Sequence, residues 1–120
     1  MLTNLSPAPD ILTIVREFLE SDILRDPGLS DDKRFNLRVA VNLLATAERE
    51  LRLGPAANAA EDKRLSEFVG AEGSLEDKNR RLALAIREGA IAGDDPRLLD
   101  HLRSTTVDAL RINNPKWLDG

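Results

Sequence analysis

The order of apolar and polar residues in the N-terminal half of the chain predicts two amphipathic helices. Apolar side chains recur three and four residues apart over residues 10–24 and again over residues 32–53, the spacing that lines one face of a helix. The first face consists of Ile11, Leu12, Ile14, Val15, Phe18, Leu19 and Ile23. The second consists of Leu37, Val39, Ala40, Leu43, Leu44, Ala47 and Leu51. Ser30 and Asp31 are typical N-caps for the second helix, and Gly54-Pro55 predicts a sharp end to it.

Three further helices are predicted in the C-terminal half. Asn58 and Glu61 have the spacing of a capping box for a short helix that ends at Val69 or Gly70. Ser74 caps a fourth helix, and Asp95-Pro96 begins a fifth that runs to about Ile112. Their apolar faces carry Leu65, Phe68, Val69, Leu75, Leu82, Ile86, Leu98, Leu99, Leu102, Ala109 and Leu110. No segment alternates as a strand does.

We therefore expect an all-α fold, a compact bundle of about five helices in a single domain over residues 1–120. Residues 1–9 and 113–120 are expected to be flexible or packing tails. A length of 120 residues is typical of one domain, and no window holds the roughly 18 consecutive apolar residues of a membrane span. The first residues lack the basic and apolar regions of a signal peptide, so we expect a cytoplasmic protein.

Composition narrows the chemistry that is open to this chain. The 17 basic and 21 acidic residues give a net charge of −4, whereas nucleic-acid binders are typically basic, so no nucleic-acid partner is expected. The chain has no cysteine, no tyrosine, one histidine and one tryptophan, which excludes thiolate catalysis and cysteine-bound metals. No metal or cofactor motif occurs, and we expect neither.

The acidic pairs and the histidine favour structural roles over catalysis. Asp31-Asp32 and Asp94-Asp95 lie where helices begin, so capping and the helix dipole account for them. His101 is expected to be a partly exposed helix residue, because its sequence neighbours Asp100 and Ser104 cannot converge on it as a triad. Whether the chain is an enzyme stays open, with binding favoured over catalysis.

Arginines form the most distinctive polar pattern. At 100° per residue, Arg34, Arg38, Arg49 and Arg52 fall within a sector of about 60° on the helix over residues 32–53, with Asn42 beside them. Guanidinium groups bind carboxylates and phosphates through paired donors, so this stripe is a candidate site for an anion or an acidic partner. Internal pairing with acids of neighbouring helices, such as Asp22 or Glu88, is the alternative.

Trp117 is the most suggestive apolar residue, because it follows the last predicted helix on a short tail. It either folds back and closes the bundle, or it anchors a partner or a second copy, since tryptophan is enriched at interfaces.

Several segments together resemble a known family. They are residues 14–20, 35–42, 48–51, 53–55 and 112–118, and their most specific parts are Arg38-Val39-Ala40-Val41-Asn42 and Asn114-Pro115-Lys116-Trp117. In this order and spacing they resemble the bacterial domain-of-unknown-function 6285 family, from about Pro9 to Leu118. The resemblance implies a helical fold, gives no catalytic residues, and implies genes encoded beside aminoglycoside-phosphotransferase-like proteins and acyl-CoA dehydrogenases.

Three functions follow as hypotheses. The first is an accessory protein that binds a phosphotransferase-like or acyl-CoA-handling enzyme, as the resemblance implies, through Arg34, Arg38, Asn42, Arg49, Arg52 and Trp117. The second is a module that binds acyl-CoA or a phosphorylated metabolite, with the phosphates on the arginines. The third is a stand-alone enzyme that would have to use carboxylates, arginines or His101. A monomer and a homodimer are both open.

Overall fold

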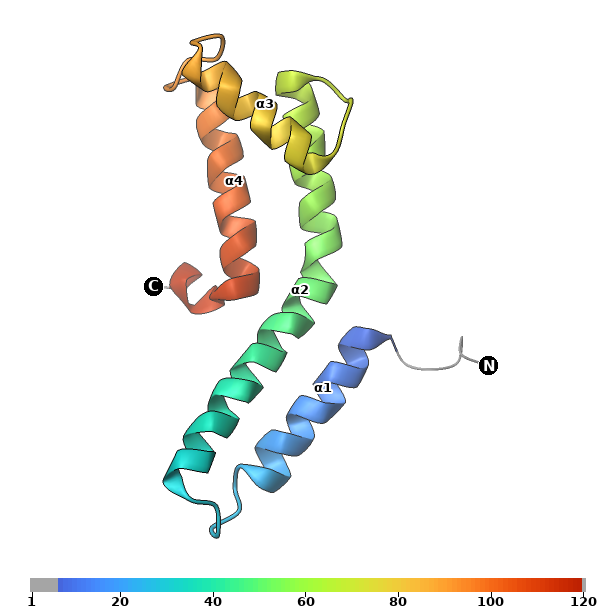
Figure 1. The fold of residues 1–120 in the computed structure, drawn as a ribbon, viewed down its shortest axis with the longest axis vertical. Helices are drawn as coiled ribbons and strands as arrows, with labels where there is room; N and C mark the ends of the chain where they lie inside the picture. The colour runs from blue at the N-terminus through green and yellow to red at the C-terminus, as the bar shows by residue number, and fades with distance from the viewer. Residues whose placement is uncertain (1–6, 120) are drawn as a thin grey trace, which may run out of the picture. The chain divides into compact units, whose positions relative to one another are not determined.

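The fold is all-α, as the sequence predicts, but it has four α-helices and not five. A computed structural model describes residues 7–119, and Figure 1 shows its elements in chain order. They are α1 (Ala8–Phe18), a π-helical turn η2 (Leu19–Ile23), α2 (Asp31–Val69), α3 (Leu75–Arg87), α4 (Pro96–Asn113) and a 3₁₀ turn η3 (Pro115–Leu118). The described part of the chain contains no strand. Residues 1–6 of the expected N-terminal tail lie outside the described residues, whereas Ala8 and Pro9 belong to α1.

The count differs because α2 continues through Pro55, where the sequence predicts a break. A proline inside a helix removes one hydrogen bond and crowds the preceding residue, which costs about 3 kcal/mol. Here the preceding residue is Gly54, which has no Cβ to clash with the proline ring. Alanines at positions 56, 57, 59 and 60 then favour helix on the far side. Asn58 and Glu61 therefore lie inside a helix and do not form the predicted capping box.

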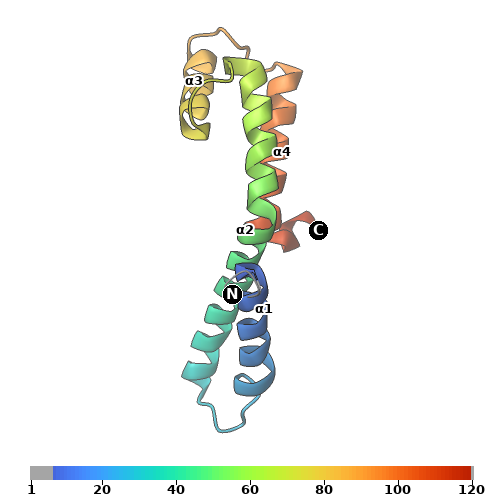
Figure 2. The ribbon, with the colours of Figure 1, turned by 90° about the vertical axis from the view of Figure 1, so that its right-hand side faces the viewer.

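The chain divides into two compact units, unit 1 (Met1–Leu53) and unit 2 (Gly54–Gly120). In unit 1, α1 lies alongside the N-terminal half of α2 in both views (Figures 1 and 2). Val41 is the one buried apolar residue among residues 7–53, and α1 has no buried residue. The predicted apolar face of α1 is largely exposed: Ile14 is 62% and Phe18 is 52% accessible.

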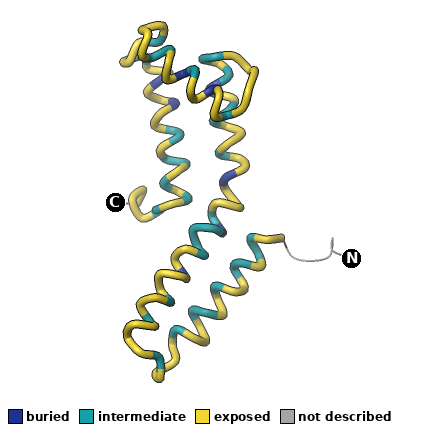
Figure 3. Tube along the Cα trace, in the orientation of Figure 1, coloured by how far each residue is buried: buried dark blue, intermediate teal, exposed yellow. Residues whose placement is uncertain are grey.

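Unit 2 has a small apolar core where α3 and α4 meet the C-terminal half of α2. Leu65, Leu82 and Leu98 are at most 4% exposed. Phe68, Val69, Leu75, Ile86 and Ile91 pack against them. Figure 3 shows several of the buried positions in these three helices. The predicted core residues on α3 are confirmed, but on α4 Leu99, Leu102 and Ala109 are exposed and only Leu98 is buried.

The starts of α3 and α4 and the C-terminal end of α2 follow the sequence signals. Ser74 and Asp77 form a reciprocal capping box at the start of α3, and Asp95 accepts a hydrogen bond from the backbone N–H of Arg97 at the start of α4. These bonds lower the pKa of both carboxyl groups, with the backbone N–H groups as the largest cause. At the end of α2, Gly70 has a φ of +91°, a left-handed conformation that glycine adopts without strain.

Candidate functional site

A buried carboxylate connects the two helices of unit 1. Glu48 on α2 is 7% exposed and accepts a hydrogen bond from the Thr13 hydroxyl at 2.7 Å. Arg16 on α1 donates to the same carboxylate through Nε and through Nη2, and to Glu20 at 3.1 Å. The Arg16 guanidinium lowers the pKa of Glu48, and this bond raises the pKa of Arg16 in turn. The two helices of the hairpin are thus joined by a buried ion pair and its hydrogen bonds.

Two of the predicted arginines also contribute to the fold of unit 1. Arg52 pairs with Asp10 at 3.0 Å and donates to the Thr13 hydroxyl at 3.0 Å. Arg34 donates to three backbone carbonyl oxygens of the connection between α1 and α2, namely those of Leu24, Asp26 and Leu29. Internal bonding therefore applies to these two, although the acceptors are not the Asp22 and Glu88 that the sequence suggested.

The remaining residues of the stripe differ in their exposure and in their hydrogen bonds. Arg38 is exposed and has no ion pair or hydrogen bond from its side chain within residues 7–119. Arg49 is half-buried and donates to the Thr46 hydroxyl at 3.3 Å. The Asn42 side chain is exposed next to Arg38. A groove beside these residues is lined by Glu20, Leu24, Arg25, Arg34, Arg38, Val41 and Asn42.

Trp117 belongs to η3 in unit 2 and is 73% exposed. It is not among the residues that pack on the core of Leu65, Leu82 and Leu98. The preceding Pro115 begins the 3₁₀ turn, so the tail is ordered as a short helix and presents its indole outward.

The one histidine is buried, which corrects the expectation of a partly exposed residue. His101 is 3% exposed, and its Nδ1 accepts a hydrogen bond from Arg64 Nε at 2.9 Å. Burial, and next the Arg64 charge, lower its pKa. Because Nδ1 is an acceptor, the neutral ring carries its proton on Nε2. Phe68 packs on the ring at 5.7 Å between centroids.

The surroundings of His101 form a small hollow of about 210 Å³ in unit 2. Its lining residues are Arg64, Glu67, Phe68, Arg97, Asp100, His101 and Ser104. Arg64 also donates to the Thr105 hydroxyl at 3.1 Å, and the Arg97 guanidinium lies 5.5 Å from the centre of the Phe68 ring. Both cations therefore have partners within the unit, and the hollow is better explained as packing than as a binding site.

Sequence reasoning missed these contacts of His101, and it also missed Lys78. Lys78 is 3% exposed and donates to Asp62 at 2.7 Å and to Ser66 at 3.0 Å, so it joins α3 to α2. Position at the edge of an apolar arc is a signal that could have pointed to His101. For Lys78 the sequence offers no comparable signal, because the acceptors come from another helix.

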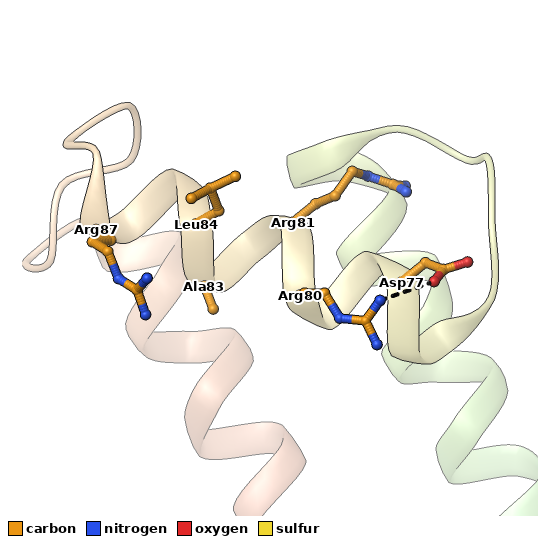
Figure 4. A pocket seen from close by; sticks show the side chains of 6 residues that line it. All are labelled: Asp77, Arg80, Arg81, Ala83, Leu84 and Arg87. Atoms are coloured by element: carbon orange, nitrogen blue, oxygen red, sulfur yellow. Dashed lines mark ion pairs between the residues drawn. The ribbon is translucent and has the colours of Figure 1, made fainter.

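A second arginine-rich surface lies on the outer side of α3 (Figure 4). The lining residues are Asp77, Arg80, Arg81, Ala83, Leu84 and Arg87. Arg80 pairs with Glu76 at 3.1 Å, and Arg81 donates to the carbonyl oxygen of Glu72. All six residues come from one helix, and these two arginines have partners nearby, so this surface is a solvated helix face.

Within residues 7–119, no group of three or more histidine, cysteine, aspartate or glutamate side chains could hold a metal ion. None of the helices in that range is long and apolar enough to cross a membrane.

Comparison with known protein families gives a match over most of the chain. Among the curated proteins and the solved structures, none is similar to the chain at a significant level. Residues 27–117, which include all of α2, α3 and α4, match the family described as Domain of unknown function (DUF6285). The match covers the Arg38–Asn42 run and the Asn114–Trp117 run on which the resemblance rested. Because it extends over more than half of the residues, the chain belongs to this family.

Proposed function

We propose that the chain is a non-catalytic helical protein that binds an acidic protein surface through the arginine stripe of unit 1. The observation that carries this proposal is the exposure of Arg38, whose guanidinium has no bonded partner within residues 7–119. A guanidinium offers five donors in a planar fork that matches a carboxylate. Asn42 adds an amide beside it, and Arg49 extends the stripe towards Arg52.

The surroundings of Arg38 favour a preformed binding surface. Arg34 is fixed by three carbonyl oxygens of the α1–α2 connection, so its charge is held beside Arg38 without being neutralised. A fixed cation next to a free one attracts an acidic partner and accelerates its association. Trp117 supplies a separate apolar anchor in unit 2, of the residue type that most often dominates binding energy.

The partner is proposed from the family resemblance. It is a phosphotransferase-like or acyl-CoA-handling enzyme, with the small protein acting as its accessory and not as a catalyst. The two proteins would be co-expressed and separated by size-exclusion chromatography, and we expect them to elute together at micromolar concentration. Independent elution, with and without nucleotide or acyl-CoA, would contradict this proposal.

Altered forms of this chain test which of its residues contact the partner. Arg38→Glu reverses the charge of the exposed guanidinium and is expected to weaken binding by roughly 30-fold or more, the effect of a central interface arginine. Arg87→Glu on α3 makes the same change at an exposed arginine outside the stripe and is the matched control. Removal of residues 115–120 tests Trp117 separately, and the proposal expects weaker binding with an unchanged melting temperature.

A second candidate function rests on the groove beside Arg38. Leu24 and Val41 give it an apolar side, and Arg25, Arg34 and Arg38 give it cations, a combination that suits an acyl-CoA or a phosphorylated metabolite. A thermal-shift screen with CoA esters and sugar phosphates tests this alternative. A shift that is lost in Arg38→Ala but kept in Arg87→Ala would favour the small molecule, and no shift with any compound would eliminate it.

A further inference from the structure

The groove beside Arg38 is formed by two segments of unit 1. Glu20, Leu24 and Arg25 come from the π-helical turn η2 and the connection that follows it, whereas the other lining residues belong to α2. Those are Arg34, Arg38, Val41 and Asn42. The groove has a volume of about 640 Å³, within the range of pockets that hold a drug-sized ligand, so it has room for several side chains of a partner.

Arg25 is a second arginine of this groove whose charge is not paired. Its side chain is exposed and forms no ion pair or hydrogen bond within residues 7–119, which is also true of Arg38. Glu20 is the one acidic residue of the lining, and its carboxylate already accepts a hydrogen bond from Arg16 at 3.1 Å. The groove therefore carries two guanidinium groups whose donors are available to an acidic ligand.

Each of these two arginines lies next to an apolar residue of the groove. Arg25 directly follows Leu24, which is half-buried, and Arg38 lies one helical turn before Val41, which is 6% exposed. Leu24 and Val41 line the same groove although they belong to different segments. Both segments thus offer an apolar contact with a cation beside it.

Arg34 holds the two segments together. From α2 it donates to the carbonyl oxygens of Leu24 and Asp26, the residues on either side of Arg25, and to that of Leu29. These bonds fix the backbone around Arg25 relative to α2 before a ligand binds. A preformed groove loses less conformational entropy on binding, which favours affinity.

We propose that the groove binds a protein segment that presents an apolar side chain between two carboxylates, with Arg25 and Arg38 each holding one carboxylate. This inference rests on the proposed function and names the chemistry of the partner's contact segment. Two guanidinium groups are complementary to two carboxylates, and each pair gains charge-assisted hydrogen bonds. Leu24 and Val41 contact the apolar side chain. Three of the seven lining residues are exposed, so the groove is open and suits a protein segment better than a small molecule, which a pocket normally encloses.

Peptide titrations of the intact chain test this inference. The probe is a labelled peptide with blocked ends in which glutamate, leucine and glutamate alternate with serines, because alternate residues of an extended peptide lie on one side. We expect saturable binding with a dissociation constant below roughly 1 mM. One control peptide has serine in place of leucine, and another has glutamine in place of both glutamates. Each is expected to bind at least about 10-fold more weakly.

Substitutions in the groove identify the contacts. Arg25→Gln and Arg38→Gln each remove one guanidinium and are expected to weaken binding of the peptide at least about 10-fold. Neither arginine has a partner within residues 7–119, so both variants are expected to keep the melting temperature of the unaltered chain. Lys33→Gln removes an exposed cation of α2 outside the groove and is the matched control. Absence of saturable binding, or equal losses in Arg25→Gln and Lys33→Gln, would overturn the inference.

Failure of this inference is distinguishable from failure of the proposed function. If the partner enzyme co-elutes and Arg38→Glu weakens the complex while Arg25→Glu behaves like Arg87→Glu, the proposed function stands and the inference is overturned. If no partner co-elutes, the proposed function fails, and the peptide titration still confirms or overturns the chemistry of the groove. A thermal shift by a CoA ester or a sugar phosphate that both Arg25→Gln and Arg38→Gln abolish, without binding of the peptide, would assign the groove to a small molecule and overturn the inference.

Discussion

The two units of the chain are stabilised by different kinds of contact. Unit 2 buries Leu65, Leu82 and Leu98 together in one apolar core. In unit 1 a buried carboxylate, Glu48, connects α2 to Arg16 and Thr13 of α1. Its apolar residues face outward and not towards each other. The difference shows that amphipathic helices in one chain can be joined in two ways, by an apolar core or by a buried ion pair.

Shortening one buried side chain in each unit should have the largest effect on the free energy of unfolding and should distinguish unit 2 from unit 1. Leu65→Ala removes a side chain that is 0% exposed in unit 2, and we expect the free energy of unfolding to fall by about 3–4 kcal/mol. Val41→Ala removes two methyl groups from unit 1 and should cost about 1.5 kcal/mol. Urea unfolding followed by hydrogen exchange in each unit measures both. Equal losses would contradict the difference between the units.

Neutralising the buried carboxylate tests what joins the hairpin. Glu48→Gln keeps the shape of the side chain but removes the charge that Arg16 and Thr13 bind, and we expect a loss of about 2 kcal/mol in unit 1. Glu17→Gln, at an exposed glutamate of α1, is the matched control and should change little. Hydrogen exchange of α1 reports the effect. If the two variants behave alike, the ion pair is not what stabilises unit 1.

Acid should affect the two units over different pH ranges. The pKa of His101 is lowered in the folded chain, so the unfolded chain binds more protons just below pH 6.5 and the stability of unit 2 falls as the pH drops through that range. The pKa of Glu48 is also lowered, so its contribution is complete above pH 4.5 and is lost as the pH falls further. Melting temperatures against pH, followed in each unit, measure both transitions. His101→Gln should remove the first transition and leave the second, and a first transition that persists would rule out His101 as its cause.

The smallest effect is expected at the capping box of α3. Ser74 caps the Asp77 N–H at 3.0 Å, and Ser74→Ala should cost about 1 kcal/mol in unit 2 with none in unit 1. A melting scan of the variant, with hydrogen exchange to assign the loss to a unit, checks this. Loss of protection in α1 would show that the two units are coupled.

Periodicity and cap residues were sufficient to predict the all-α class and the starts of α3 and α4. It failed at Pro55, because the pattern marks a proline as a helix end and does not weigh the neighbouring glycine and alanines that let α2 continue. It also placed Ile14, Phe18 and Leu43 on apolar helical faces, and all three are exposed. Periodicity shows which side of a helix is apolar, and it says nothing about whether that side is covered within the same chain.

For a related reason, the sequence could predict the candidate site only in part. The arginines share a helix, so their common sector follows from 3.6 residues per turn. Their partners, Asp10 for Arg52 and the loop carbonyls for Arg34, come from another element and depend on how α1 is placed. The sequence therefore identified the stripe but could not show that Arg38 alone has its guanidinium unbonded while Arg34 and Arg52 are engaged. The buried positions of Glu48 and His101 depend on the same kind of long-range placement.

Hydrogen exchange of two variants tests the central claim most directly, that unit 2 is stabilised by its own apolar core whereas unit 1 is joined by the buried ion pair of Glu48. Glu48→Gln and Leu65→Ala would be exchanged beside the unaltered chain, and the amides of α1 compared with those of α3. The account predicts that Glu48→Gln lowers the protection of α1 and leaves α3 unchanged, and that Leu65→Ala lowers the protection of α3. Equal loss of protection in α1 and α3 for both variants would contradict it.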